Sequence, residues 1–229
     1  MKIIILAAGL GSRLGAEEGP KALVPLINGK TILEHQLDNL ARYVKISDVR
    51  VVVGYQEEKI RAHFPHLAFV QNPHFRTENT SKSLLRALQD IENEDVLWLN
   101  GDVVFNHSVI AKLLLNRRNS MVVNISIVGE EEVKYRLDGV GCIVEVSKTV
   151  DDAPGEAVGI NYFTAADLNL LKEALSECKP DDYFEKGIQL CLDAAVDVWA
   201  VEVVPEDTVE IDFPEDLEKA NRLIKTWGE

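Results

Sequence analysis

The feature that most constrains the fold is a continuous apolar run, residues 3–8, which ends at Gly9 and Gly11. Six apolar residues without polar alternation are typical of a strand that is buried on both faces of a parallel sheet. Glycines directly after such a strand let backbone N–H groups approach an anion closely, because no Cβ stands in the way. The run therefore predicts a parallel α/β sheet whose first loop cradles a phosphate.

Strand and helix patterns alternate through the first 115 residues. Apolar residues at helical spacing follow Thr31, a residue type that commonly caps helices. Beyond this helix we expect strands at residues 49–53, 67–70 and 96–99 and helices at residues 57–64 and 84–91. The alternation predicts a doubly wound, mostly parallel sheet, whose ligand site lies at the carboxyl ends of the strands.

The second half of the chain has a different pattern. Strand-like runs separated by charged or glycine-bearing turns occupy residues 121–128, 133–137, 142–146 and 157–163. Helical spacing returns at residues 165–175 and 183–194, a strand follows at residues 198–204, and Pro214 begins a last helix. We therefore predict one domain over residues 1–229, an α/β fold with a mixed sheet and an inserted, β-rich region that faces the substrate.

Net charge excludes one class of partner. The 229 residues include 38 acidic and 24 basic side chains, which gives a net charge of -14. Such a surface repels phosphate backbones, so we expect no nucleic-acid partner. A small anionic substrate stays possible, provided that cations are gathered locally around it.

The cysteines and the hydropathy of the sequence indicate the cellular compartment. Cys142, Cys178 and Cys191 are odd in number and form no CxxC motif, which fits a reducing compartment, so we expect a cytoplasmic protein. The apolar run after Lys2 is shorter than most signal-peptide cores, and no stretch approaches the ~20 apolar residues of a membrane-spanning helix. We therefore expect neither a signal peptide nor a membrane span, and no pattern indicates an oligomeric state.

The first loop carries more than its glycines. Its sequence runs Gly9-Leu10-Gly11-Ser12-Arg13-Leu14, with Pro20-Lys21 downstream. A dinucleotide fingerprint would need a glycine where Leu14 stands, and the Gly-Lys-Ser/Thr of a Walker loop is missing. Arg13 and Lys21 are two cations in one loop of an acidic protein, which suits the binding of a polyphosphate.

This combination of glycines, Arg-Leu and Pro-Lys resembles the signature of the sugar-phosphate nucleotidyltransferases, the group that includes glucose-1-phosphate thymidylyltransferase and phosphocholine cytidylyltransferase. The resemblance implies that the loop wraps a nucleoside triphosphate, with Ala8 and Gly9 beside the base and Arg13 and Lys21 on the phosphates. It also implies that Gly11 and Ser12 contribute to this site. Residues 1–115 would then be the nucleotide-binding half and residues 116–229 the acceptor-binding half.

Two aspartates end predicted strands. Asp102 follows Asn100-Gly101 after one strand, and Asp212 follows another strand just before the helix that begins at Pro214. Two carboxylates at strand ends can hold Mg²⁺, which usually takes one or two protein carboxylates together with substrate phosphates. The resemblance implies metal-binding aspartates at both places, a catalytic role for Asp102 with Lys21 and Arg13, and nucleotide contact at Gly101. The alternatives are helix capping by Asp212 and a turn role for Asp102.

An asparagine-rich loop indicates the subgroup. Asn72, Asn79 and Ser83 match the loop that precedes a helix in choline-phosphate and related cytidylyltransferases. Amide and hydroxyl groups both donate and accept hydrogen bonds, so they can recognise a pyrimidine edge or the ribose. Helix capping by Thr80 or Ser81 is the alternative role for this segment.

The acceptor side resembles the same subgroup less specifically. There the resemblance points to Lys134, Lys148, Glu156 and Asn161 as acceptor-binding residues, with Lys148 and Lys134 on the acceptor phosphate. Either lysine could equally be a solvated strand residue.

The residues and the resemblance together predict a Mg²⁺-dependent nucleotidyltransferase. Its partners would be a nucleoside triphosphate, with CTP favoured, and a small phosphomonoester or phosphonate such as phosphocholine, and it would release pyrophosphate. The main alternative is a sugar-1-phosphate uridylyl-, guanylyl- or thymidylyltransferase. A non-catalytic nucleotide-binding regulator is a more distant alternative, and the incomplete fingerprint disfavours a dehydrogenase.

Overall fold

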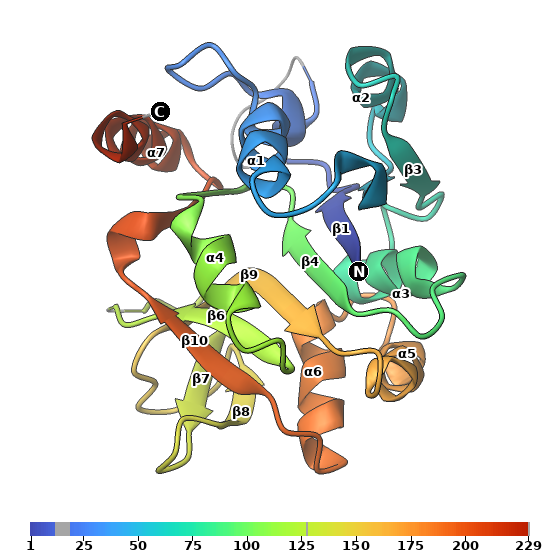
Figure 1. The fold of residues 1–229 in the computed structure, drawn as a ribbon, viewed down its shortest axis with the longest axis vertical. Helices are drawn as coiled ribbons and strands as arrows, with labels where there is room; N and C mark the ends of the chain where they lie inside the picture. Colours follow the sequence, from blue (N-terminus) through green and yellow to red (C-terminus); the bar gives the residue numbers. More distant parts are fainter. Residues whose placement is uncertain (12–18, 127, 229) are drawn as a thin grey trace.

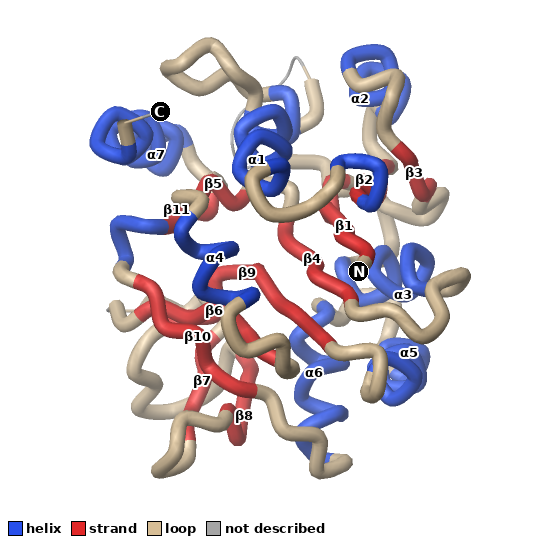
Figure 2. Tube along the Cα trace, in the orientation of Figure 1, coloured by secondary structure: helices blue, strands red, loops and turns tan. Residues whose placement is uncertain are grey.

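A mixed, mainly parallel sheet forms the centre of the protein. The computed structural model describes residues 1–11, 19–126 and 128–228. The strand order is β10-β6-β9-β4-β1-β2-β3, as Figures 1 and 2 show. Four neighbouring strands are parallel, namely β1 (Lys2–Ala7), β2 (Val49–Val53), β3 (Ala68–Gln71) and β4 (Val96–Asn100). The predicted fold class is confirmed.

The second half of the chain extends this same sheet. β9 (Glu156–Phe163) runs antiparallel to both β4 and β6 (Ser120–Asn124), and β10 (Trp199–Val203) runs parallel to β6. A hairpin of β7 (Lys134–Leu137) and β8 (Ile143–Ser147) joins β9 through β7. The β-rich segment therefore lies beside the amino-terminal strands and continues their sheet.

Helices cover both faces of the sheet. One face packs against α1 (Ile32–Ala41), α2 (Glu57–His63) and α4 (Ser108–Leu114). The other face packs against α3 (Thr80–Leu88), α5 (Leu168–Glu177) and α6 (Phe184–Asp193). In β1, Ile3 and Ile5 belong to the first core and Ile4 and Leu6 to the second, which explains why the strand is apolar throughout.

The first helix begins as its sequence predicts. Thr31 Oγ1 accepts a hydrogen bond from the Glu34 backbone N–H at 3.2 Å, and Glu34 Oε2 accepts one from the Thr31 N–H at 2.6 Å. This reciprocal capping box satisfies two amides that have no partner within the helix.

A small second sheet brings together two distant parts of the chain. β5 (Val103–Phe105) pairs antiparallel with β11 (Thr208–Glu210), and Val103 lies opposite Glu210. The last helix, α7 (Pro214–Trp227), packs against this pair in a separate apolar cluster. The sequence does not predict β5 or α4, because three and seven residues are too few for a clear periodicity. Within the described residues, three single turns of 3₁₀ helix complete the elements, at Lys21–Leu23, Ile46–Asp48 and Pro205–Asp207.

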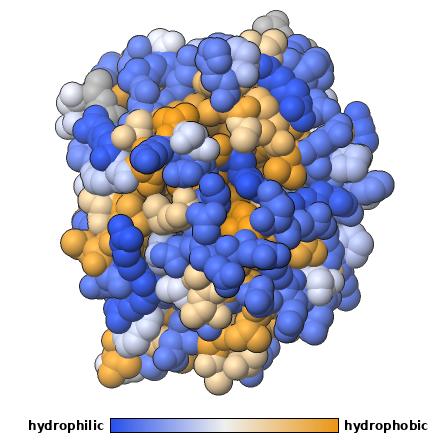
Figure 3. Space-filling view, turned by 45° about the vertical axis from the view of Figure 1, so that its right-hand side comes forward, coloured by the Kyte–Doolittle hydropathy of each residue, from blue (hydrophilic) through white to orange (hydrophobic). Residues whose placement is uncertain are grey.

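Among the described residues, no helix has the length and apolar character needed to cross a membrane. On the face drawn in Figure 3, hydrophilic residues predominate and apolar residues form smaller groups between them.

Candidate active site

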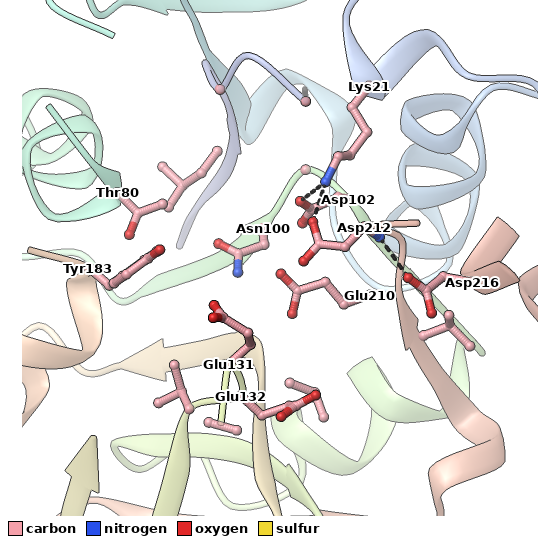
Figure 4. A pocket seen from close by; sticks show the side chains of 18 of the residues that line it. Lys21, Thr80, Asn100, Asp102, Glu131, Glu132, Tyr183, Glu210, Asp212 and Asp216 are labelled. Atoms are coloured by element: carbon pink, nitrogen blue, oxygen red, sulfur yellow. Dashed lines mark hydrogen bonds and ion pairs between the residues drawn. The ribbon is translucent and has the colours of Figure 1, made fainter. Parts of the chain in front are cut away.

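A large cavity opens at the carboxyl ends of the parallel strands, the edge at which doubly wound sheets bind their ligands. It encloses about 670 Å³. Its walls include the end of β1 with Ala8 and Gly9, the turn after β4 with Gly101, and the first turns of α3 and α6. Figure 4 shows Lys21 with two aspartates toward one end of the cavity and Tyr183 toward the other.

Lys21 bridges the two predicted metal ligands. Its Nζ donates to Asp102 Oδ2 at 2.9 Å and to Asp212 Oδ1 at 2.8 Å (Figure 4). Burial alone would lower the pKa of Lys21, but the charges and hydrogen bonds of the two carboxylates outweigh it and raise the pKa. The structure therefore brings together a charged ammonium and two carboxylates that lie far apart in the sequence.

Backbone hydrogen bonds hold the two aspartates in place. The Ile211 N–H donates to the Asp102 carbonyl at 3.0 Å, which continues the pairing of β5 with β11. Asp216 Oδ2 accepts from the N–H groups of Asp212 at 3.0 Å and Phe213 at 2.8 Å. Asp216 thus caps the start of α7, and the Asp212 carboxylate faces Lys21.

A buried glutamine fixes the turn that carries Asp102. Gln36 Nε2 donates to the carbonyls of Asn100 at 2.9 Å and Val103 at 2.8 Å, on either side of Gly101-Asp102. The turn itself is tight, since a Cβ at Gly101 would lie 2.7 Å from the Leu6 carbonyl oxygen. Sequence reasoning missed Gln36, because a polar residue in an amphipathic helix is usually expected to face water.

Glu210 adds a third carboxylate beside the aspartates. Asp102, Glu210 and Asp212 offer oxygens that all lie within 4.8 Å of one another. The Glu210 side chain opens onto the cavity but is surrounded by protein atoms. The resulting desolvation is the main cause that raises the pKa of Glu210, and the negative charges of Asp102 and Asp212 raise it further. Sequence reasoning missed Glu210, although its position two residues before Asp212 offered a signal, since such residues share one face of a strand.

This carboxylate group fits a divalent cation. Asp102 Oδ1 is buried and has no hydrogen-bond partner among the described residues. A buried carboxylate oxygen without a partner is costly, and a hard cation is one partner that satisfies it. Asp102, Asp212 and Glu210 are therefore the residues that could hold Mg²⁺.

The glycine loop is described only in part. Ala8, Gly9 and Gly11 line the cavity, and Gly11 has a φ of +62°, a value that favours glycine. The predicted residues Ser12 and Arg13 lie outside the described residues.

The asparagine-rich loop divides into cavity-lining and supporting residues. Asn79 and Ser83 line the cavity, whereas Asn72 is fully buried and donates to Ser83 Oγ at 3.0 Å. Asn79 also caps α3, because its Oδ1 accepts from the Thr80 N–H at 2.8 Å. Asn72 therefore reaches the cavity only through Ser83.

Of the four predicted acceptor-binding residues, two line the cavity and two do not. Lys148 and Glu156 line the cavity. Lys134 does not, and its Nζ donates to the Lys148 carbonyl at 3.0 Å. Asn161 is 1% exposed in the middle of the sheet, opposite Trp98 and Met121, and does not line the cavity. The structure thus places Lys148 and Glu156, but neither Lys134 nor Asn161, against the space that a substrate would fill.

Several cavity residues have no counterpart in the sequence predictions. Lys148 Nζ lies 3.3 Å from Glu131 Oε2 and 4.9 Å from the centre of the Tyr183 ring. Glu132 and Glu185 line the same part of the cavity, and burial raises the pKa of Glu185 to about 7. No spacing signal links these residues, because they come from separate loops and the first turn of α6.

The described cavity wall is predominantly acidic. It carries three lysines, Lys21, Lys148 and Lys219, against nine carboxylates, namely Glu78, Asp102, Glu131, Glu132, Glu156, Glu185, Glu210, Asp212 and Asp216. Such a wall suits a ligand that brings positive charge along with its phosphates.

Comparison with known proteins identifies the family. Residues 3–177 match the profile of the MobA-like NTP transferase domain. The chain belongs to this family. The predicted membership of the nucleotidyltransferases is thereby confirmed, and the MobA-like domain covers β1 to α5 with most of the cavity wall.

Two curated relatives of this MobA-like chain act on different acceptors. It is 37% identical over 121 residues to a CMP-5'-(3-aminopropyl)phosphonate synthase from Streptomyces rubellomurinus, a match that covers 49% of the chain but only 19% of the relative. It is 29% identical over 239 residues to a 2-C-methyl-D-erythritol 4-phosphate cytidylyltransferase from Shewanella piezotolerans, with 98% and 95% covered. It also spans 26% of a bifunctional protein GlmU from Methanococcus maripaludis. The chain thus spans less than a third of the length of two of these three relatives.

Solved structures share the fold of the MobA-like chain. The CTP:phosphocholine cytidylyltransferase from Streptococcus pneumoniae superposes with a TM-score of 0.80 and 22% identity, over 97% of this chain and 98% of that one. The inositol-1-phosphate CTP transferase from T. maritima superposes with a TM-score of 0.77 and 21% identity, over 100% and 96%. At this identity the similarity establishes the α/β nucleotidyltransferase fold.

Proposed function

We propose that the protein is a Mg²⁺-dependent cytidylyltransferase. It would join the CMP of CTP to a small phosphomonoester or phosphonate, with phosphocholine as one candidate acceptor, and release pyrophosphate. The observation that carries the proposal is the convergence of Lys21 with Asp102, Asp212 and Glu210 beside the glycine loop. The names of the relatives support CTP, since CMP or CTP occurs in several and cytidylyl transfer in others.

The chemistry requires charge neutralisation more than proton transfer. An acceptor phosphate has a second pKa near ~6 and is largely dianionic at neutral pH, so it needs no general base. Bound at Asp102, Asp212 and Glu210, Mg²⁺ would neutralise phosphate charge and draw the two anions together. The N–H groups around Gly9 and Gly11 and the ammonium of Lys21 would donate to phosphate oxygens. Arg13 is proposed to act on the same phosphates.

Lys21 has a second role in this proposal. In the absence of substrate, its ammonium separates two carboxylates that would otherwise repel each other. An ammonium has three donors, so it can turn toward a phosphate oxygen without leaving the site. Lys21 would thus offset the charge of the two carboxylates before substrate binds and then stabilise negative charge on the departing pyrophosphate.

A sugar-1-phosphate nucleotidyltransferase is the second candidate, because a Bacillus anthracis protein assigned as a glucose-1-phosphate thymidylyltransferase also shares this fold, with a TM-score of 0.77. A non-catalytic regulator is disfavoured, since Lys21, Asp102 and Asp212 are present and in contact. We also propose a cytoplasmic setting, which the three buried, unpaired cysteines support.

One assay tests the proposal. Pyrophosphate release is measured with each of four nucleoside triphosphates against phosphocholine, 2-aminoethylphosphonate, inositol phosphate and several sugar 1-phosphates. We expect release with CTP and one of the non-sugar acceptors, only when Mg²⁺ is supplied. Release with UTP, GTP or dTTP and a sugar 1-phosphate would favour the second candidate, and no release with any pair would overturn the proposal.

A further inference from the structure

The relatives divide the possible acceptors into two kinds. Two act on acceptors with a nitrogen cation, aminopropylphosphonate and phosphocholine, and two act on polyol phosphates. The part of the cavity that would bind the acceptor indicates which of the two kinds of acceptor this chain uses. We name Glu131, Tyr183, Glu185 and Lys148 the distal wall. All four line the cavity, and Figure 4 shows Tyr183 on the side away from Lys21.

We propose that the acceptor is an ω-aminoalkyl phosphate or phosphonate, and that Glu185 selects it by accepting a hydrogen bond from its primary ammonium. This inference rests on the proposed cytidylyl transfer and narrows its acceptor. It assigns to Glu185 a role in specificity, distinct from the phosphate chemistry at Lys21.

Glu185 is a buried carboxylate, and one of its oxygens lacks a hydrogen-bond partner among the described residues. It is the second residue of α6, its side chain lines the cavity, and it is only 6% exposed. Its Oε2 has no hydrogen-bond partner among the described residues, and none of their lysines or arginines lies within 4.0 Å of it. A buried carboxylate without a partner is costly to fold, and such groups concentrate where a ligand completes them.

The distal wall already binds one alkylammonium, the side chain of Lys148. Lys148 Nζ lies 3.3 Å from Glu131 Oε2 and 4.9 Å from the centre of the Tyr183 ring. A carboxylate and an aromatic face are the two groups that stabilise an ammonium most directly. Lys148 is only partly buried and has a flexible stem, and its positive charge also acts on Glu185. A substrate ammonium could therefore displace Lys148 and interact with Glu185.

Charge and hydrogen-bonding capacity distinguish the candidate acceptors. A polyol hydroxyl can donate to Glu185, but it leaves the negative charge of the buried carboxylate uncompensated. A quaternary ammonium compensates the charge, but it has no N–H to donate to Oε2. A primary ammonium does both, which favours an aminoalkyl acceptor over inositol phosphate and over phosphocholine.

Matched acceptors test this selection directly. With CTP and Mg²⁺, kcat/KM is compared for 3-aminopropylphosphonate against propylphosphonate, which lacks only the amine, and for phosphoethanolamine against phosphocholine. We expect the primary amine to be preferred in both pairs by at least about tenfold, the effect of one charge-assisted hydrogen bond. Glu185→Gln should bring both ratios close to one, whereas Glu177→Gln, on the exposed end of α5, should keep the wild-type ratios.

The outcomes separate this inference from the proposed function. Pyrophosphate release with equal efficiency for an amine and its matched analogue would overturn the inference and leave the cytidylyltransferase intact. Wild-type ratios in a folded Glu185→Gln protein, verified by circular dichroism, would also overturn it. No release from CTP with any acceptor would overturn the proposed function itself.

Discussion

The backbone N–H of Ile211 donates a 3.0 Å hydrogen bond to the carbonyl oxygen of Asp102. This bond continues the pairing of β5 with β11 and ties together the two segments that carry Asp102 and Asp212. The separation of the two carboxylates is therefore set by backbone pairing, and Lys21 closes the gap between their side chains. Preorganisation of this kind is what electrostatic catalysis requires.

Removal of either charge in this arrangement should slow catalysis strongly without unfolding the protein. We expect Asp102→Ala and Lys21→Ala to lower pyrophosphate release by about 10²–10³-fold, the usual effect of deleting one preorganised electrostatic group. Circular dichroism should report an unchanged fold, because both side chains line the cavity and not the apolar core. Lys45→Ala, at an exposed position before β2, is the matched control. Wild-type release in either site variant would rule out the assigned roles.

Gln36 should affect the Mg²⁺ concentration that the enzyme requires, because it holds the turn that carries Asp102. Gln36→Met keeps the length of the side chain but removes both hydrogen bonds to the carbonyls beside Asp102. Each lost bond costs about 1 kcal/mol or more, and the turn gains freedom. We expect the Mg²⁺ concentration for half-maximal pyrophosphate release to rise severalfold.

A neighbouring asparagine gives the control for Gln36. Asn39 Nδ2 donates to the Phe105 carbonyl at 2.7 Å, from the same helix but farther along β5. Asn39→Leu should lower stability to a similar extent, measured by urea unfolding, and leave the Mg²⁺ requirement unchanged. A parallel shift of the Mg²⁺ requirement in both variants would mean that Gln36 contributes stability alone.

The turn before Asp102 has no space for a side chain. A Cβ at Gly101 would lie 2.7 Å from the Leu6 carbonyl oxygen and 2.9 Å from the Ala7 Cβ. We expect Gly101→Ala to lower the free energy of unfolding by about 1–3 kcal/mol, because β1 and β4 must separate to admit the methyl group. Gly139→Ala, where no atom lies within 4 Å of the added Cβ, should have little effect. Equal unfolding free energies in urea would contradict this account.

Sequence periodicity predicts the main sheet well, and the reason is burial. β1 and β2 are buried on both faces, so their residues are apolar without interruption, and Thr31 marks the start of α1 by its capping box. Asp102 and Asp212 are predictable because each follows a recognisable strand. The sequence could not reveal Gln36 or Glu185, whose roles depend on tertiary packing that brings their helices against a turn and a cavity.

Glu185 should make stability depend on pH in a defined direction. Burial raises its pKa from 4.5 to about 7, so between these values the folded protein binds a proton that the unfolded chain releases. Folding stability from this group is therefore present at low pH and is lost as the pH rises through about 7. The loss amounts to about 3 kcal/mol when the carboxylate is fully ionised. Glu185→Gln, which mimics the neutral acid, should be more stable than the wild type by about this amount at pH 8 and nearly equal to it at pH 4.5. Urea unfolding at the two pH values measures the difference, and a difference that does not change with pH would show that Glu185 is not a desolvated carboxylate.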